Sequence, residues 1–416
     1  MNRLIIKKSL LPLLFLPVLL FSQDGGGEYN LYNHHSCLSE QDRIIIWNEI
    51  KENLKSLQNQ DIIIKKNQSV SFIWPLRKDT SLVFNSYFGI SNFVDQDTTT
   101  GLILDYNCLS RSYDGHGGTD IFTWPFPWYL YDNNYIDVIA AEDGVIINKH
   151  DGHDDDHCPS TSGGTWNAVY VQHNDGSIVW YGHLKKNSLT SKSIGQTVTK
   201  GEFLGKVASS GTSTGPHLHL EVHDSSWNLI DPFQGSCNSL NSSSWWSNQR
   251  NYREPILNAL LTHSEKPIHG CPGINEDPNM SNYFIIGDSV FFAAYYTDRE
   301  VGDSAKYRIK TPDNTIWDSW NQVSSTVYNA SWYYWKRLLP QNGPFGIWKF
   351  EIEFNGHTYL HEFQYATSLS IEDEKNEIKR LVLNTDILGR ETKLAMNKFL
   401  LYIYDDGTVE KRIVVE

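Results

Sequence analysis

The chain has 416 residues, of which 40% are hydrophobic and 20% charged, and its formal net charge at pH 7 is −14. This length allows about two to three domains of about 150 residues each. Because nucleic-acid binding needs clustered Lys and Arg opposite the phosphates, the acidic balance predicts no nucleic-acid partner. The 14 Trp, 22 Tyr and 18 Phe, set in short alternating runs, favour a mainly β fold.

Residues 1–22 have the pattern of a secretory signal peptide. Arg3, Lys7 and Lys8 supply positive charge, and the run from Leu10 to Phe21 is apolar apart from two prolines. This run is too short for a comfortable membrane span. We therefore predict a secreted or cell-surface protein with no stable membrane span after signal removal. A retained membrane anchor is the alternative.

The chain contains five cysteines, and pairing is the default expectation for an exported protein. The odd number leaves at least one cysteine free or bonded to another molecule, and the spacing leaves the connectivity open. None lies in a Cys-x-x-Cys pair, which argues against a zinc site built on thiolates. The cysteines are Cys37, Cys108, Cys158, Cys237 and Cys271.

Residues 23–66 are predicted to form an N-terminal segment with one helix, over Ser39 to Leu57. Ser39 and Asp42 resemble an acidic capping box at the start of this helix. We interpret the helix as a packing element. Its expected apolar stripe consists of Ile44, Ile45, Trp47, Ile50 and Leu54.

The rest of the chain divides by composition into β-rich regions and connectors. Residues 67–240 contain short strands and Gly-rich turns, with a hairpin turn expected at Asn174-Asp175-Gly176. Residues 241–266 are rich in Ser and Asn and are interpreted as a connector. The strand spacing over 267–367 indicates a β-sandwich-like accessory domain. Residues 368–416 read as a charged linker followed by a small β tail that ends in a hairpin.

The stretch GPHLHLEV, from Gly215 to Val222, carries two histidines in an otherwise apolar strand. Because side chains alternate along a strand, His217 and His219 share one face while the leucines point to the other. The apolar face can pack into a core, and the other can present imidazole nitrogens to a cleft.

A second motif, HGGTD, places His116 and Asp120 beside two glycines, which allow the backbone to turn sharply. His116, Asp120 and one histidine of the His-x-His strand would form a three-ligand zinc site. The fourth position is then left for water, as in catalytic zinc sites. A closed site with four protein ligands would instead indicate a structural role.

Together, HGGTD, WYGHL and SSGTSTGPHLHLEV resemble the motifs of the M23 family of zinc metallopeptidases, of the lysostaphin and LytM type. The resemblance covers about residues 70–235 and implies an antiparallel β-sheet peptidase domain. It implies His116, Asp120 and His219 as ligands of Zn²⁺, and His183 and His217 as the other two active-site residues. Two unligated imidazoles could accept a proton from water and stabilise the oxyanion. The sequence leaves open which of them is the base.

The resemblance implies hydrolysis of peptide cross-links in peptidoglycan, often next to glycine or D-alanine. One alternative within the same class is an extracellular protease that cuts Gly-rich proteins such as elastin. The alternative from another class is a zinc-loaded, non-catalytic binding protein at the cell surface.

Three further sets of residues could be either functional or purely structural. The stretch HDGHDDDHC, residues 150–158, could bind a metal by composition, but we interpret it as a solvated acidic loop at the rim of the cleft. His34, His35 and His173 have no partners at ligand spacing and are taken as ordinary polar residues. The segment from Trp124 to Asn134 is either an aromatic wall for substrate or packing.

The tail, with TDILGRE and LLYIYDDGTVEKRIVVE, resembles the C-terminal sorting domains of proteins exported by the type IX secretion system. This resemblance implies that the secretion machinery is a partner, and that the tail is cleaved or used for surface attachment. The alternative is a terminal hairpin that caps the sandwich.

Overall fold

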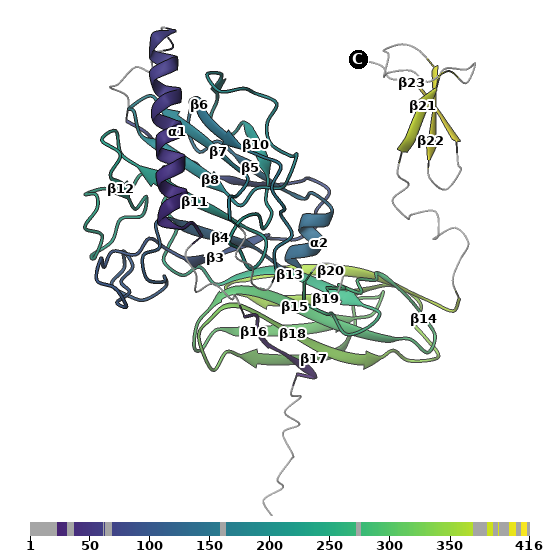
Figure 1. Cartoon of the computed structure of the whole chain (residues 1–416). Helices are drawn as coiled ribbons and strands as arrows, with labels where there is room; N and C mark the ends of the chain where they lie inside the picture. Colours follow the sequence, from purple (N-terminus) through teal and green to yellow (C-terminus); the bar gives the residue numbers. More distant parts are fainter. Residues whose placement is uncertain are drawn as a thin grey trace, which may run out of the picture.

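The computed structural model describes residues 23–30, 37–60, 62, 69–158, 164–271, 276–368, 381–385, 390, 399–404 and 409–413 (Figure 1). The predicted signal peptide, His34 and His35 lie outside these residues. The described chain is built mostly of antiparallel strands, which confirms the prediction of a mainly β fold. Within the described ranges, neither helix combines the length and apolar character that a bilayer crossing requires.

The largest sheet has eight strands and carries the sequence motifs. Its order is β3-β4-β11-β8-β7-β6-β9, and β12 pairs with β11. A turn at residues 174–177 joins β7 to β8, as the hairpin pattern predicts. The bounds are β3 (Phe88–Asn92), β4 (Thr119–Thr123), β6 (Gly144–His150), β7 (Ala168–His173), β8 (Ile178–Gly182), β9 (Thr197–Val198), β11 (His217–His223) and β12 (Leu229–Ile230).

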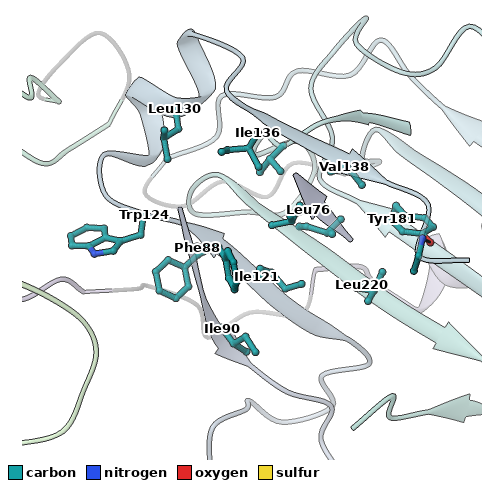
Figure 2. Packing of buried hydrophobic residues seen from close by; sticks show 14 of the residues in the cluster. Leu76, Phe88, Ile90, Ile121, Trp124, Leu130, Ile136, Val138, Tyr181 and Leu220 are labelled. Carbon is teal, nitrogen blue, oxygen red and sulfur yellow. Dashed lines mark hydrogen bonds between the residues drawn. The ribbon is translucent and has the colours of Figure 1, made fainter. Parts of the chain in front are cut away.

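A second, three-stranded sheet lies in the order β10-β5-β2 and shares the main core with the large sheet. Its strands are β2 (Leu76–Lys78), β5 (Ile136–Ile139) and β10 (Phe203–Lys206). Figure 2 shows Leu220 of β11 and Ile121 of β4 among the side chains of this core, with Val138 of β5. The face of β11 opposite its histidines is therefore buried among apolar side chains, as the alternation predicts.

Helix α1 (Glu40–Asn59) crosses the large sheet (Figure 1) and begins at the predicted N-cap. Ser39 accepts a hydrogen bond from the Asp42 amide while the Asp42 carboxylate accepts one from the Ser39 amide, which completes the capping box. The predicted apolar stripe is wrong in part, because Ile44 and Ile45 are each 45% exposed. The side chains buried against the sheet are Ile46, Ile50 and Leu57.

The sandwich consists of two sheets around an aromatic core. Strand β13 begins inside the stretch expected as a connector. It lacks simple alternation because Leu257 packs into the sandwich core while Ala259 and Leu261 pack into the peptidase-side core. The first sheet contains β1 (Gly25–Glu28), β13 (Ile256–His263), β15 (Ser289–Arg299) and β18 (Tyr328–Leu338). The second contains β14 (Tyr283–Ile285), β16 (Ser304–Lys310), β17 (Ile316–Val323), β19 (Gly346–Phe354) and β20 (His357–Ala366).

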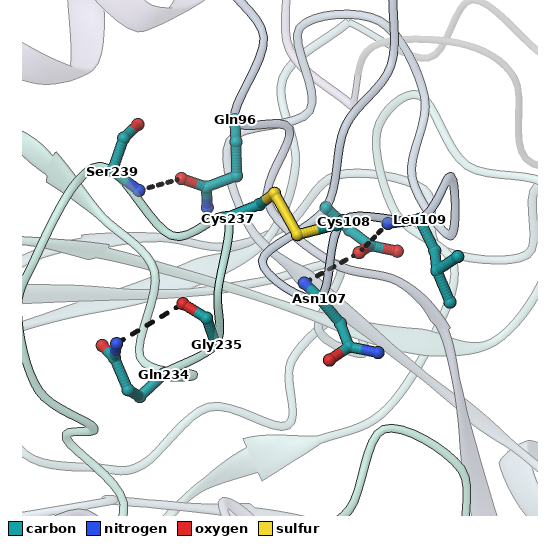
Figure 3. Close-up of a disulfide and its surroundings, with 9 residues drawn as sticks. Gln96, Asn107, Cys108, Leu109, Gln234, Gly235, Cys237 and Ser239 are labelled. Atoms are coloured by element: carbon teal, nitrogen blue, oxygen red, sulfur yellow. Dashed lines mark hydrogen bonds between the residues drawn. A yellow bond between two sulfur atoms is a disulfide. The ribbon is translucent and has the colours of Figure 1, made fainter.

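Two disulfides and one free thiol account for the cysteines. Cys108 pairs with Cys237 (Figure 3), and Cys158 pairs with Cys271, while Cys37 is free and buried. The second disulfide joins the acidic loop after β6 to the segment that follows β13.

The C-terminal tail forms a small antiparallel sheet of three strands, β21 (Leu381–Thr385), β22 (Phe399–Tyr404) and β23 (Val409–Ile413). Strands β22 and β23 are hydrogen-bonded neighbours, as expected for the predicted terminal hairpin. The residues of its turn lie outside the described chain.

Candidate metal centre

Two neighbouring strands and the loop before them bring the three predicted ligands together. Asp120 on β4 and His219 on β11 are direct partners in the antiparallel register, so their side chains share a face. His116 lies in the loop that leads into β4. Gly118 of this loop lies against His219, and a Cβ there would be only 2.6 Å from the imidazole ring. A glycine is therefore needed for the loop to approach β11 this closely.

The donor atoms of these three side chains converge. His219 Nδ1 is 2.8 Å from Asp120 Oδ1, and His116 Nε2 is 3.2 Å from the same oxygen. The two ring nitrogens are 3.3 Å apart. A tetrahedral ion with bonds of about 2.0–2.1 Å would separate its ligand atoms by about 3.3 Å. The observed spacing is close to that of one face of such a tetrahedron.

The outward-facing atoms of His116 and Asp120 are held by hydrogen bonds. His116 Nδ1 lies 2.8 Å from the carbonyl oxygen of Phe93 and donates to it, which leaves the lone pair of Nε2 facing the centre. Asn92 Nδ2 donates to Asp120 Oδ2 at 3.1 Å. Metal-binding histidines usually donate their second N–H in this way, which fixes the ring and its tautomer.

Glu221 plays the same part for His219. Its Oε2 lies 3.1 Å from His219 Nε2, and its Oε1 accepts from His223 Nε2 at 2.9 Å and from Arg43 at 2.5 Å. Burial raises the pKa of the Glu221 carboxyl, but the positive charge of Arg43 and the hydrogen bonds from His219 and His223 together outweigh burial and hold it well below its usual value. An ionised Glu221 therefore fixes Nε2 of His219 as the donor and leaves Nδ1 free to bind a cation.

These hydrogen bonds leave two nitrogen lone pairs and one carboxylate oxygen facing one another in a buried space. Such an arrangement needs positive charge at its centre. Without a metal ion, protons would supply it: burial lowers the pKa of His116, but the charge and hydrogen bond of Asp120, together with the nearby Cys37 sulfur, outweigh burial and raise it to about 9. Conversely, burial raises the pKa of Asp120, but His116 and the other histidines hold it well below its usual value. The donor set fits a divalent cation.

His183 and His217 lie beside this centre with matching hydrogen-bond patterns. His183 follows β8 directly, and its Nδ1 donates to Ser210 O at 2.6 Å. His217 Nδ1 donates to Gly215 O at 2.8 Å. Within the described residues, Nε2 of both rings is buried without a hydrogen-bond partner, and the ring centroids are 4.3 Å apart. Each imidazole therefore offers an unused Nε2 acceptor, and His217 Nε2 is 3.7 Å from Asp120 Oδ1.

The two imidazoles differ in their electrostatic surroundings. Burial lowers the pKa of His183, and the neighbouring His217 lowers it further. Burial also lowers the pKa of His217, but the nearby Cys37 sulfur and the charge of Asp120 raise it above the usual value. Paired groups whose environments separate their pKa values are suited to divide acid and base roles.

Cys37 is a residue of this centre that motif analysis missed. One donor atom from each of Cys37, His116, Asp120 and His219 lies within 4.8 Å of every other, and the same holds for Cys37, His183 and His217. The Sγ atom also lies 3.1 Å from Tyr113 Oη. The argument against a thiolate in the site, based on Cys-x-x-Cys spacing, therefore does not hold, because this single cysteine reaches the ligands from a distant segment.

Glu221 was also missed, although the strand pattern contained a signal for it. It follows His217 and His219 at the same spacing of two, so HLHLE places all three on one face.

We expect Glu221→Gln to weaken metal affinity by about 10- to 100-fold, the usual cost of changing such an outer partner. The neutral amide lacks the negative charge with which the Glu221 carboxylate accepts hydrogen bonds from His219, His223 and Arg43. Competition with a chelating dye measures the affinity, and Glu362→Gln, at an exposed position on β20, is the matched control. Unchanged affinity would show that Glu221 does not orient His219.

The acidic stretch 150–158 does not form a comparable centre. Asp154 is exposed and pairs with Lys186, whereas Asp155 is buried and accepts from Tyr131 Oη at 3.0 Å. Among the described residues, the only groups of three or more metal-binding side chains with such close donor atoms are the two that contain Cys37. His173 is buried and binds the Asp143 carbonyl instead, away from the centre.

A cavity of about 620 Å³ adjoins His217. Its walls come from the segment 214–217, from the chain after β13 and from β18 of the sandwich. Of the aromatic segment at 124–134, Trp128 lines this cavity, whereas Trp124 and Phe126 are fully buried packing residues. The cavity thus extends from His217 to a surface shared with the sandwich.

Comparison with protein families identifies one matching region. Residues 130–232 match the model of peptidase family M23. This region includes His183, His217 and His219, and it begins after His116 and Asp120. The chain therefore contains a segment similar to M23 peptidases.

Named relatives match shorter stretches of the chain. A DD-carboxypeptidase/endopeptidase Mpg of Neisseria meningitidis is 42% identical over 85 residues, or 20% of this chain and 16% of that protein. An uncharacterized metalloprotease of Haemophilus influenzae is 35% identical over 86 residues, which are 21% of this chain and 16% of that protein. The chain thus spans only 16% of the length of these two relatives.

Among solved structures, the catalytic domain of the prophage-encoded M23 protein EnpA from Enterococcus faecalis is 24% identical, with a TM-score of 0.19. That match covers 38% of this chain and 92% of the other.

Proposed function

We propose that this chain, whose residues 130–232 match peptidase family M23, is a zinc metalloendopeptidase that hydrolyses peptide cross-links of peptidoglycan. The observation that carries the proposal is the convergence of His116, Asp120 and His219 beside two buried imidazoles with unused Nε2 atoms. Metal ligands alone would serve a structural site. Adjacent proton acceptors are what hydrolysis needs in addition.

Zinc is the metal we assign, because two imidazoles and one carboxylate are its usual ligands at this spacing. When bound, Zn²⁺ would polarise the scissile carbonyl and lower the pKa of a water molecule toward about 7. His116, Asp120 and His219 would hold it, with Phe93 O, Asn92 and Glu221 fixing their orientation.

The chain's own residues would then move the protons. Nε2 of His183 or His217 accepts a proton from the attacking water as the water oxygen bonds to the carbonyl carbon. The same proton is delivered to the leaving amine as the C–N bond breaks, so that the imidazole returns to its neutral state. The second imidazole must carry a proton on both nitrogens, so that its Nε2 donates a hydrogen bond to the negative carbonyl oxygen. The opposite pKa directions of His183 and His217 support such a division of roles.

The cavity beside His217 is the substrate-binding cleft in this proposal. Trp128 from the peptidase side and Trp332 from the sandwich both line it, so an extended peptide would contact apolar surface from both domains. The sandwich then contributes to substrate binding as an accessory domain.

Peptidoglycan is the substrate class supported by the relatives, one of which is named a DD-carboxypeptidase/endopeptidase. Cleavage of Gly-rich proteins such as elastin is the alternative within the same chemistry. Export is proposed on the signal-peptide pattern of residues 1–22 and on the two disulfides, which persist in oxidising compartments. Use of the C-terminal tail by a secretion machinery remains part of this proposal.

The test is hydrolysis of purified peptidoglycan, pentaglycine and elastin by the zinc-loaded protein and by its Cys37→Ala variant. We expect cleavage of peptidoglycan cross-links that a chelator abolishes and added Zn²⁺ restores. Mass spectrometry of the released fragments identifies the bond. If neither protein cleaves any of the three substrates, the chain is a non-catalytic binding protein.

A further inference from the structure

We propose that the Cys37 thiolate is a fourth ligand of the metal held by His116, Asp120 and His219, and that it keeps the site inactive until Cys37 moves away from the metal. The ligation follows from geometry alone. Its inhibitory consequence rests on the proposed function.

The position of Sγ is the first argument. It belongs to both close groups in the centre, the one with His116, Asp120 and His219 and the one with His183 and His217. The sulfur therefore lies between the three ligands and the imidazole pair. This is the place that the attacking water and the scissile carbonyl must share during hydrolysis.

The two imidazoles give an independent indication that a ligand belongs at this place. Nε2 of His183 and Nε2 of His217 are both buried and lack hydrogen-bond partners among the described residues. Unsatisfied buried polar atoms are costly, and native structures usually keep them for a ligand or water. Cys37 fills the space that such a ligand would use.

The chemistry of Cys37 suits ligation. The other four cysteines form disulfides, so Cys37 is the one free thiol of the chain, and its side chain is buried. Thiolate is a strong ligand for zinc, with a bond of about 2.3 Å. A Cys-His-His-Asp set would close the coordination sphere and leave no position for water.

Helix α1 is what presents the thiol. Its capping box fixes the chain at Ser39, two residues after Cys37. One turn later, Arg43 pairs with Glu221, which in turn holds His219. The segment that delivers the sulfur is therefore tied to the outer partner of a metal ligand.

Release does not require the helix to leave the sheet. Cys37 precedes the N-cap, whereas the residues that pack α1 onto the sheet, Ile46, Ile50 and Leu57, all lie beyond it. A movement confined to Cys37 and Leu38 would withdraw the sulfur and open the fourth position. The arrangement thus provides a reversible block.

The direct test of ligation replaces zinc by Co²⁺ in the intact protein and records its absorption spectrum. A thiolate ligand gives a sulfur-to-cobalt charge-transfer band in the near ultraviolet. We expect this band in the wild-type protein and its loss in Cys37→Ser and in Cys37→Ala, with one Co²⁺ still bound in each. Lys55→Ala, at an exposed position on α1, is the control that keeps the band. A wild-type spectrum without the band overturns the proposal.

Hydrolysis of peptidoglycan peptides by the same proteins tests the block. If the open state has the population of an ordinary minor state, about 0.1–10%, removing the ligand raises kcat/KM by about 10- to 1000-fold. Equal activity of the wild-type and Cys37→Ala proteins overturns the block.

The two readouts separate this proposal from the proposed function. A charge-transfer band together with inactive variants would uphold ligation and reject the peptidase, since the site would then be structural. An active wild-type protein without the band would uphold the peptidase and reject ligation.

Discussion

Replacing His219 with alanine, in a Cys37→Ala background, is expected to remove stoichiometric zinc binding and to reduce peptide hydrolysis to the level of the metal-free protein. His219 supplies Nδ1 to the centre and is the one ligand that Glu221 orients. Without it, only His116 and Asp120 remain, one ligand short of the usual three of a catalytic zinc site. Metal content after dialysis and hydrolysis of a defined muropeptide measure the two losses.

His153→Ala is the matched control, because His153 is exposed in the acidic loop that composition also marked as a metal-binding candidate. This variant should keep both zinc and activity. If hydrolysis survives His219→Ala, the zinc assignment fails. If it is lost in His153→Ala instead, the acidic loop holds the functional metal.

The alternation of His217 and His219 with leucines placed two imidazoles on one face and a core on the other, and the structure has this arrangement. The pairing of Asp120 with His219 across β4 and β11 could only be expected from the family resemblance. Register between strands distant in sequence depends on the whole sheet, so spacing alone does not specify it.

The residues that hold the metal ligands in place divide into those that the sequence pattern could have indicated and those that it could not. Glu221 continues the period of two and was within reach of pattern analysis. Arg43 was not, because its contact with Glu221 depends on how α1 lies on the sheet. In the predicted apolar stripe of α1 only Ile44 and Ile45 are wrong, since they are chemically equal to Ile46 and only packing selects Ile46.

Cys37 shows the same limit more clearly. No local pattern distinguishes it from the other four cysteines, which all pair. Its place in the centre depends on docking of the N-terminal segment against Tyr113, which lies 76 residues later in the chain. Strand β13 was missed for a related reason, because a strand buried between two cores does not alternate.

Replacing either His183 or His217 with alanine is expected to lower kcat by about 10²–10⁴-fold while zinc binding stays stoichiometric. Neither ring is needed for the ligand set, but each offers a buried Nε2 beside it. If one ring is the base and the other donates to the oxyanion, the pH dependence of kcat/KM changes only in the variant that lacks the base. The measurements are kcat and kcat/KM of each single variant across pH in the Cys37→Ala background, with metal content determined for each variant.

The double variant distinguishes a working pair from two independent contributions. Groups that act as a unit are strongly non-additive, so removing both should cost little more than removing the more important one. Thermal unfolding of each variant excludes loss of fold as the cause, since both rings are buried. Loss of zinc in His217→Ala would mean that the ligand roles of His217 and His219 are reversed. In that case the pairing of Glu221 with His219 would serve catalysis by positioning a proton acceptor, and His217 would hold the metal with His116 and Asp120.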